Sequence, residues 1–125
     1  IDLDGNDYWI WQEIHKIRPR VVIIEYNAVF PPPFRWVMAY REDHQWDQSS
    51  YFGASLESLV ALAEEKGYVL VGCDFAGCNA FFVRSDIDLD PFESTTTADH
   101  HYEPPRYFLK SAIGHVQGFG PFENL

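Results

Sequence analysis

The stretch that decides the fold is residues 1–9, which have the sequence IDLDGNDYW. Apolar and acidic residues alternate up to a Gly-Asn-Asp turn, and an apolar periodic segment begins at Trp9. This order predicts the end of a buried strand, a tight turn and the start of a helix. We expect Asn6 or Asp7 to cap that helix and Gly5 to permit the turn.

The composition describes an acidic chain with enough apolar residues for one packed domain. It has 125 residues, of which 46% are hydrophobic and 17% aromatic, and a net charge of −10. Nucleic acids and anionic membranes attract basic surfaces, so neither is an expected partner. No apolar run approaches the roughly 20 residues of a membrane span. The two cysteines, Cys73 and Cys78, are expected to be free thiols of a cytoplasmic protein.

The first half of the chain combines a helical period with a β-branched run. Ile10, Ile14 and Ile17 recur at helical spacing and predict the buried stripe of a helix that Pro19 ends. The run at 21–24, Val-Val-Ile-Ile, has no polar alternation. Such a run predicts a strand covered on both faces, as in a parallel sheet flanked by helices.

The second half begins with a long aromatic segment over residues 27–50, which we interpret as a lid or substrate wall. Ser55 is placed to cap a helix, and Gly67 is placed to end it. Two β-rich runs, 68–73 and 79–84, are separated by a turn and predict an antiparallel hairpin.

Acidic and amide side chains follow both predicted strands of the first half. Asp2 and Asp4 lie at the end of the first, and Glu25 and Asn27 at the end of the second. If the helix between them is a right-handed crossover, these four side chains meet at one edge of the sheet. Ligands of open α/β sheets bind at that edge. Clustered oxygen ligands also suit magnesium or calcium, so a divalent ion is an open alternative there.

Several motifs resemble, in their order and spacing, the C-terminal half of a class I S-adenosylmethionine-dependent methyltransferase, closest to the FkbM-like group. They are Ile-Asp-Leu-Asp-Gly at 1–5, Val-Ile-Ile-Glu at 22–25, Gly-Tyr at 67–68 and Phe-Val-Arg at 82–84. Asp4 stands where that family usually has Glu. The resemblance implies an α/β fold with a partial Rossmann-like sheet, mostly parallel with a C-terminal antiparallel hairpin, flanked by helices.

The resemblance also implies domain boundaries and a strand order. Residues 1–88 would be the C-terminal half of the methyltransferase-like domain, and residues 89–125 an irregular extension. The strand 79–84 would insert between 21–26 and 68–73. The first strand would then be left at a free edge, so a homo-oligomer is expected, with the helix after the acidic turn as its contact.

The roles of the site residues follow from the same resemblance. Asp2, Asp4, Glu25 and Asn27 would be catalytic, one carboxylate acting as base on a small-molecule acceptor. Asp4, together with Gly5 and Asn6, would contact the cofactor. No Gly-x-Gly turn between a strand and a helix is present. We therefore expect a fragment whose upstream portion is missing. S-adenosylmethionine would bind in the intact parent protein, with no cofactor and no activity for this chain alone.

Three alternatives remain open. Asp2-Leu3-Asp4-Gly5 resembles the motif of haloacid-dehalogenase-like phosphohydrolases, with Asp2 as nucleophile and Asp4 as general acid, but Asn6 replaces their threonine. The acids also match part of an EF-hand calcium loop, in which Asp7 stands where glycine belongs. A non-catalytic binding module would use the aromatic segment 27–50 and the acids to hold a sugar, a peptide or a protein.

Overall fold

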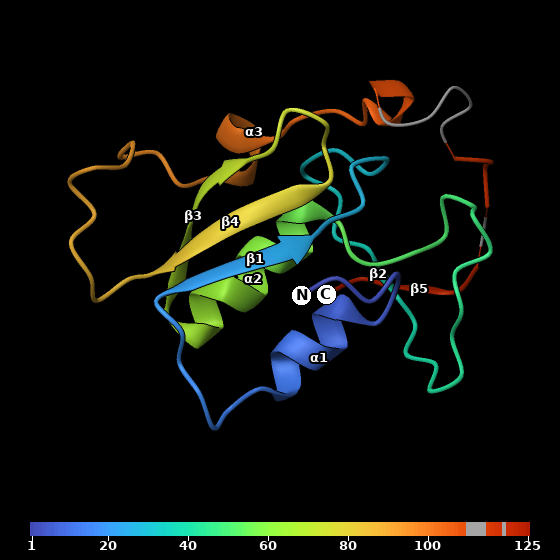
Figure 1. The fold of residues 1–125 in the computed structure, drawn as a ribbon, viewed down its shortest axis with the longest axis horizontal. Coiled ribbons are helices and arrows are strands. Elements are labelled where there is room, and N and C mark those ends of the chain that lie inside the picture. The colour runs from blue at the N-terminus through green and yellow to red at the C-terminus, as the bar shows by residue number, and fades with distance from the viewer. Residues whose placement is uncertain (110–114, 119) are drawn as a thin grey trace.

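In the computed structural model, residues 1–109, 115–118 and 120–125 are described (Figure 1). The elements, in chain order, are α1 (Asp7–Glu13), β1 (Val21–Glu25), β2 (Val37–Met38), α2 (Leu56–Lys66), β3 (Tyr68–Cys73), β4 (Asn79–Arg84), α3 (Ala98–His101), a 3₁₀ turn (Tyr107–Leu109) and β5 (Phe122–Glu123). The strands predicted at 21–24, 68–73 and 79–84 are confirmed, because each β-rich run folds as the sequence pattern indicated.

The main sheet has three strands in the order β1-β4-β3, and β2 pairs with β5 in a separate two-stranded sheet. β4 is antiparallel to both of its neighbours, so β1 and β3 run in the same direction without touching. The predicted insertion of strand 79–84 between the other two is therefore confirmed.

The predicted mostly parallel, Rossmann-like sheet is wrong. All strand pairs of both sheets in the described ranges are antiparallel. The reason lies in residues 1–4, which form a turn instead of a strand, so that Ile1 is the residue of this segment that bonds to the edge of β1 opposite β4. The N–H of Ile1 donates to Ile23 O at 2.7 Å, and Glu25 N–H donates to Ile1 O at 3.2 Å. In a parallel pair, one residue bonds to the residues before and after its partner on the other strand. Ile1 bonds in this way to Ile23 and Glu25, so it pairs with Ile24 in a parallel sense.

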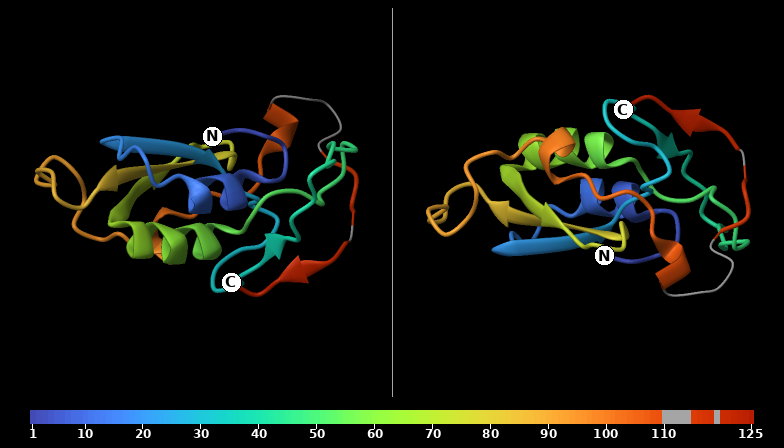
Figure 2. Two further views of the ribbon diagram at one scale, coloured as in Figure 1. Left: turned by 90° about the horizontal axis from the view of Figure 1, so that it is seen from below. Right: turned by 90° about the horizontal axis from the view of Figure 1, so that it is seen from above.

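The sheet is covered on one face. Figure 2 shows α1 and α2 on the same side of the β1-β4-β3 sheet, and none of the α-helices in the described part of the chain lies on the other side. Along β1, Val22 and Ile24 are buried, whereas Val21 and Ile23 are 51% and 48% exposed. The prediction that both faces of this strand are covered is therefore wrong. The apolar run of β1 has one buried face and one exposed face.

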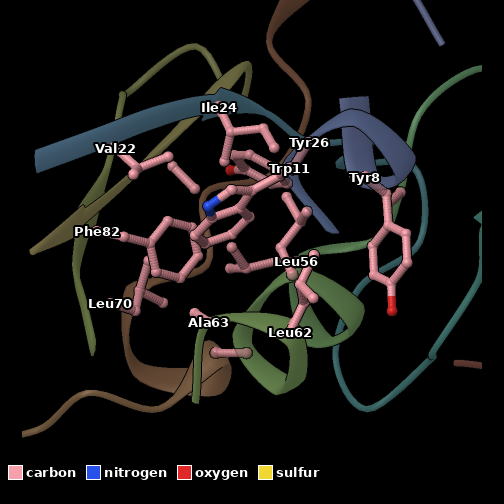
Figure 3. Close-up of a cluster of buried hydrophobic side chains, with 14 of the residues drawn as sticks. Tyr8, Trp11, Val22, Ile24, Tyr26, Leu56, Leu62, Ala63, Leu70 and Phe82 are labelled. Carbon is pink, nitrogen blue, oxygen red and sulfur yellow. The ribbon is translucent and has the colours of Figure 1, made fainter. Parts of the chain in front are cut away.

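The core lies between the sheet and the helices, with Trp11 at its centre (Figure 3). The Trp11 ring lies 5.1 Å from that of Phe82 and 5.9 Å from that of Tyr68. Aromatic contacts at these separations add to the free energy gained by burying apolar area. Around them pack the aliphatic side chains Val22, Ile24, Leu56, Leu62 and Leu70.

Helix α1 is shorter than predicted, and its buried stripe is different. It ends at Glu13, and Ile10 and Ile17 are 40% and 65% exposed. The buried side chains are instead Tyr8 and Trp11, three residues apart. Tyr8 and Trp11 therefore face the sheet, where the sequence pattern had predicted Ile10 and Ile17.

Helix α2 begins and ends where the sequence predicts. Ser55 is the N-cap, and its Oγ accepts hydrogen bonds from Ser58 N at 3.3 Å and from Trp36 N at 3.1 Å. Gly67 is left-handed with φ 76°, which a residue with a Cβ adopts at a cost. Lys66 Nζ donates to the carbonyls of Gln12 and Ile14 at 3.0 Å, so α2 also holds the end of α1.

Segments of residues 89–125 pack on the main body. Tyr102 OH donates to Ala28 O at 2.6 Å, and Tyr26 OH donates to Glu103 O at 2.7 Å. Near the other end, Ser58 Oγ donates to Leu125 O at 2.8 Å. These bonds join residues 102, 103 and 125 to positions more than 60 residues earlier in the chain. The segment also contains α3 and β5.

The buried N-cap gives the first prediction. Ser55→Ala removes the acceptor of two backbone N–H groups, and we expect it to lower the free energy of unfolding by about 1–2 kcal/mol. Chemical denaturation followed by circular dichroism measures the change. Ser94→Ala, at an exposed position, is the control and should leave the midpoint unchanged. Equal stabilities of the two variants would contradict the capping role.

Candidate functional site

Three carboxylates from two segments meet beside the end of β1. Oxygen atoms of Asp2, Asp4 and Glu25 lie within 4.8 Å of one another. Asp2 and Asp4 are exposed, and Glu25 is half-buried. The pairing of Ile1 with β1 places the acidic turn next to Glu25, so these three predicted site residues are brought together.

The turn that carries the acids is held by a fourth acid. Asp7 is fully buried, and its two carboxylate oxygens accept the N–H of Leu3 at 2.8 Å and of Gly5 at 3.0 Å. Burial raises the pKa of Asp7, and the two backbone hydrogen bonds act in the opposite direction. Asn6 is the N-cap residue of α1 without a capping side-chain bond, so Asp7 serves the turn and not the helix.

The aromatic segment 27–50 reaches back over the turn. Asn6 Nδ2 donates to Arg41 O at 2.7 Å, and His44 Nε2 lies 3.0 Å from Asp4 O. A Cβ on Gly5 would overlap the His44 ring. The resemblance assigns Asp4, Gly5 and Asn6 to the cofactor. Gly5 lies against His44 and Asn6 is bonded to Arg41, whereas the side chain of Asp4 is exposed.

Asn27 serves the loop and does not join the carboxylates. It is fully buried, and its Nδ2 donates to Ser50 O and Phe52 O, both at 2.9 Å. Its Oδ1 accepts Val29 N–H at 3.1 Å. An amide with both donor hydrogens bound inside the protein holds the segment 27–52 in place and offers no donor to a ligand.

A cavity of about 490 Å³ lies next to this site, between β1, the end of α1 and α2. Its lining is mostly apolar and includes Ile1, Ile14, Ile17, Val21, Ile23 and Tyr68. Lys66 lines it as well, but its ammonium is bonded to the end of α1, and burial lowers its pKa. Asp2, Asp4 and Glu25 do not line the cavity, and Ile1, which does line it, is next to Asp2 in the chain and bonds to the backbone of Glu25.

The sequence did not predict two further contacts, one at the acidic turn and one at α3. His44 touches the acidic turn from 40 positions away, and no local pattern announces such a contact. Glu93 lies close to the pair His100 and His101. Adjacent histidines are visible in the sequence, but the loop that returns Glu93 to them is not.

The chain was compared with family models, curated proteins and solved structures, and none of them matches it. Among the described residues, no helix is long and apolar enough to span a bilayer. Cys73 is a thiol outside any disulfide, and burial raises its pKa to about 12. Cys73 is therefore a poor nucleophile, because its thiolate is scarce at neutral pH.

The buried carboxylate of the turn gives the second prediction. Asp7→Asn replaces one acceptor by an amide donor that faces a backbone N–H, so we expect a loss of about 1–3 kcal/mol in the free energy of unfolding. Asp2→Asn is the matched control. It removes one of three neighbouring negative charges and should leave the protein equally or slightly more stable. Chemical denaturation at neutral pH compares the two, and an Asp7→Asn variant as stable as the wild type would contradict this assignment.

Proposed function

We propose that the chain is the acceptor-binding part of an S-adenosylmethionine-dependent methyltransferase-like protein. The observation that carries the proposal is the meeting of Asp2, Asp4 and Glu25 at the end of β1. The resemblance assigns these acids to the site, and they come from segments more than 20 residues apart. The order β1-β4-β3 agrees with the strand order that the resemblance implies, whereas the antiparallel pairing throughout the sheet does not agree with its parallel sheet.

The described residues do not form a cradle for the cofactor. Gly5 lies under His44, the amide of Asn6 is bonded to Arg41, and the sequence has no Gly-x-Gly turn. We therefore assign only the acceptor side of the reaction to this chain. An exposed carboxylate of Asp2 or Asp4 would accept a hydrogen bond from an acceptor hydroxyl and then take its proton.

A non-catalytic binding module is the second candidate, and the cavity is the observation that favours it. Small-molecule pockets commonly measure about 300–1,000 Å³ and are lined mostly by apolar side chains. The cavity beside β1 has that size and lining. The half-buried Glu25 and the exposed Asp2 nearby would then orient a polar group of the ligand without chemistry.

The third prediction separates these candidates. Isothermal titration of this chain with S-adenosylmethionine should show no binding, because the cradle is lacking. If the full-length protein has residues before Ile1, they should contain a Gly-x-Gly strand-turn-helix segment, and that longer chain should bind S-adenosylmethionine. Asp4→Asn in the longer chain should reduce methyl transfer and leave folding intact.

Two outcomes would overturn the methyltransferase proposal. One is tight binding of S-adenosylmethionine to residues 1–125. The other is an upstream frame that encodes no such segment. In that second case, binding of an apolar fluorescent probe at the cavity, lost in Ile17→Asp but retained in Val29→Asp, would favour the binding module. Val29 is a suitable control because it is 40% exposed and does not line the cavity.

We also propose that this chain self-associates through the open face of its sheet. Val21 and Ile23 on that face, and Ile17 beside it, are each 48–65% exposed, and all three also line the cavity at the edge of β1. Exposed apolar side chains that cluster in this way usually mark an interface. The contact expected at helix α1 is displaced to β1, because Trp11 is only 2% exposed.

The fourth prediction tests this association. Light scattering over a dilution series should give a mass above that of the monomer at high concentration and a falling mass on dilution. Ile23→Lys places a charge in the proposed contact and should shift the midpoint to at least tenfold higher concentration, about 1.4 kcal/mol. Val29→Lys should leave it unchanged. A strict monomer at high concentration would contradict the proposal.

A further inference from the structure

We infer that Glu93, His100 and His101 form a binding site for one divalent transition-metal ion of the zinc type. The three side chains lie on α3 and on the loop before it, in a part of the chain that the proposed function does not use. One carboxylate oxygen and one nitrogen from each imidazole lie within 4.8 Å of one another. This donor set mixes nitrogen and oxygen, which suits zinc and its first-row neighbours.

The donor atoms are already close in the absence of an ion. Nε2 of His100 lies 2.5 Å from Oε2 of Glu93. Nε2 of His101 lies 2.7 Å from Thr95 O, a hydrogen bond that an ion bound to this nitrogen would replace. Zinc bonds of about 2.0–2.2 Å in tetrahedral geometry require donors roughly 3.4 Å apart. The His100–Glu93 contact therefore opens by about 1 Å to admit an ion, which rotation of exposed side chains provides.

The backbone under these side chains is fixed. Ala98 is 2% exposed and belongs to the core, and Tyr102 OH donates to Ala28 O at 2.6 Å. These two residues flank the histidines and hold α3 against the body. Because the histidine backbone is held from both sides, an ion that binds the two histidines orders only their side chains, which lowers the entropy cost of binding.

The side chains themselves remain accessible. Glu93 and His100 are exposed and His101 is half-buried, so an ion reaches them from solvent. With three protein ligands, water fills the fourth position.

The other group of potential ligands, Asp2, Asp4 and Glu25, differs in chemistry. It offers oxygen atoms alone, which suit magnesium or calcium better than zinc. A site at α3 therefore makes a selective prediction. Zinc should bind in a manner that depends on the histidines and is indifferent to Asp4.

Titration calorimetry with zinc chloride at pH 7.5 tests the site on the whole chain. We expect one ion per chain, and His100→Gln, His101→Gln and Glu93→Gln should each weaken binding at least about tenfold. His15→Gln is the matched control, since His15 is exposed and outside the cluster, and Asp4→Asn is the control for the other acids. Both controls should bind zinc as the wild type does.

A second measurement avoids dependence on the variants. In wild-type protein, zinc should shift the imidazole NMR signals of His100 and His101 and leave those of His15 unchanged. Cobalt should give the visible absorption of a four-coordinate ion. Absence of zinc binding, or zinc binding that His101→Gln does not weaken, would overturn the inference. Equal shifts of all histidine signals would do the same, because they indicate adventitious surface binding.

Discussion

The site depends on one buried interaction, the acceptance of two backbone N–H groups by the Asp7 carboxylate. Leu3 and Gly5 both donate to it, and the chain between them is thereby folded into a turn. Without that turn, residues 1–4 would continue as an extended strand. With it, Ile1 alone pairs with β1, and Asp2 and Asp4 are carried to Glu25. The buried carboxylate of Asp7 thus positions the exposed carboxylates of Asp2 and Asp4.

β4 provides the second constraint, because it supplies hydrogen bonds to both β1 and β3. Its central position explains why β1 and β3 have the same direction although no parallel ladder joins them. Helices cover one face of this sheet, so alternate residues of β1 are buried and exposed. Val21 and Ile23 therefore have the β-branched character of core residues and the exposure of surface residues.

Local patterns predicted the elements well and their environment poorly. Ser55 and Gly67 set the ends of α2 through bonds and backbone angles within a few residues, so sequence sufficed. The run at β1 predicted a strand correctly, but apolar side chains alone do not reveal whether a second layer covers them. The predicted buried stripe that included Ile10 was wrong, because Trp11 packs against the sheet instead and buries more apolar area. The contact of His44 with the turn depends on a long irregular segment, which carries no periodic signal.

The charge at the acidic site restricts what can occupy it. Two carboxylates about 5 Å apart repel by roughly 1 kcal/mol in water and by 3–4 kcal/mol at an effective dielectric constant of 20. The exposure of Asp2 and Asp4 to solvent keeps this repulsion small. A ligand that covers Asp2, Asp4 and Glu25 excludes water and raises the repulsion, unless it brings positive charge or leaves a proton on one carboxylate. A ligand that carries positive charge meets that condition, because it offsets part of the negative charge of the three carboxylates.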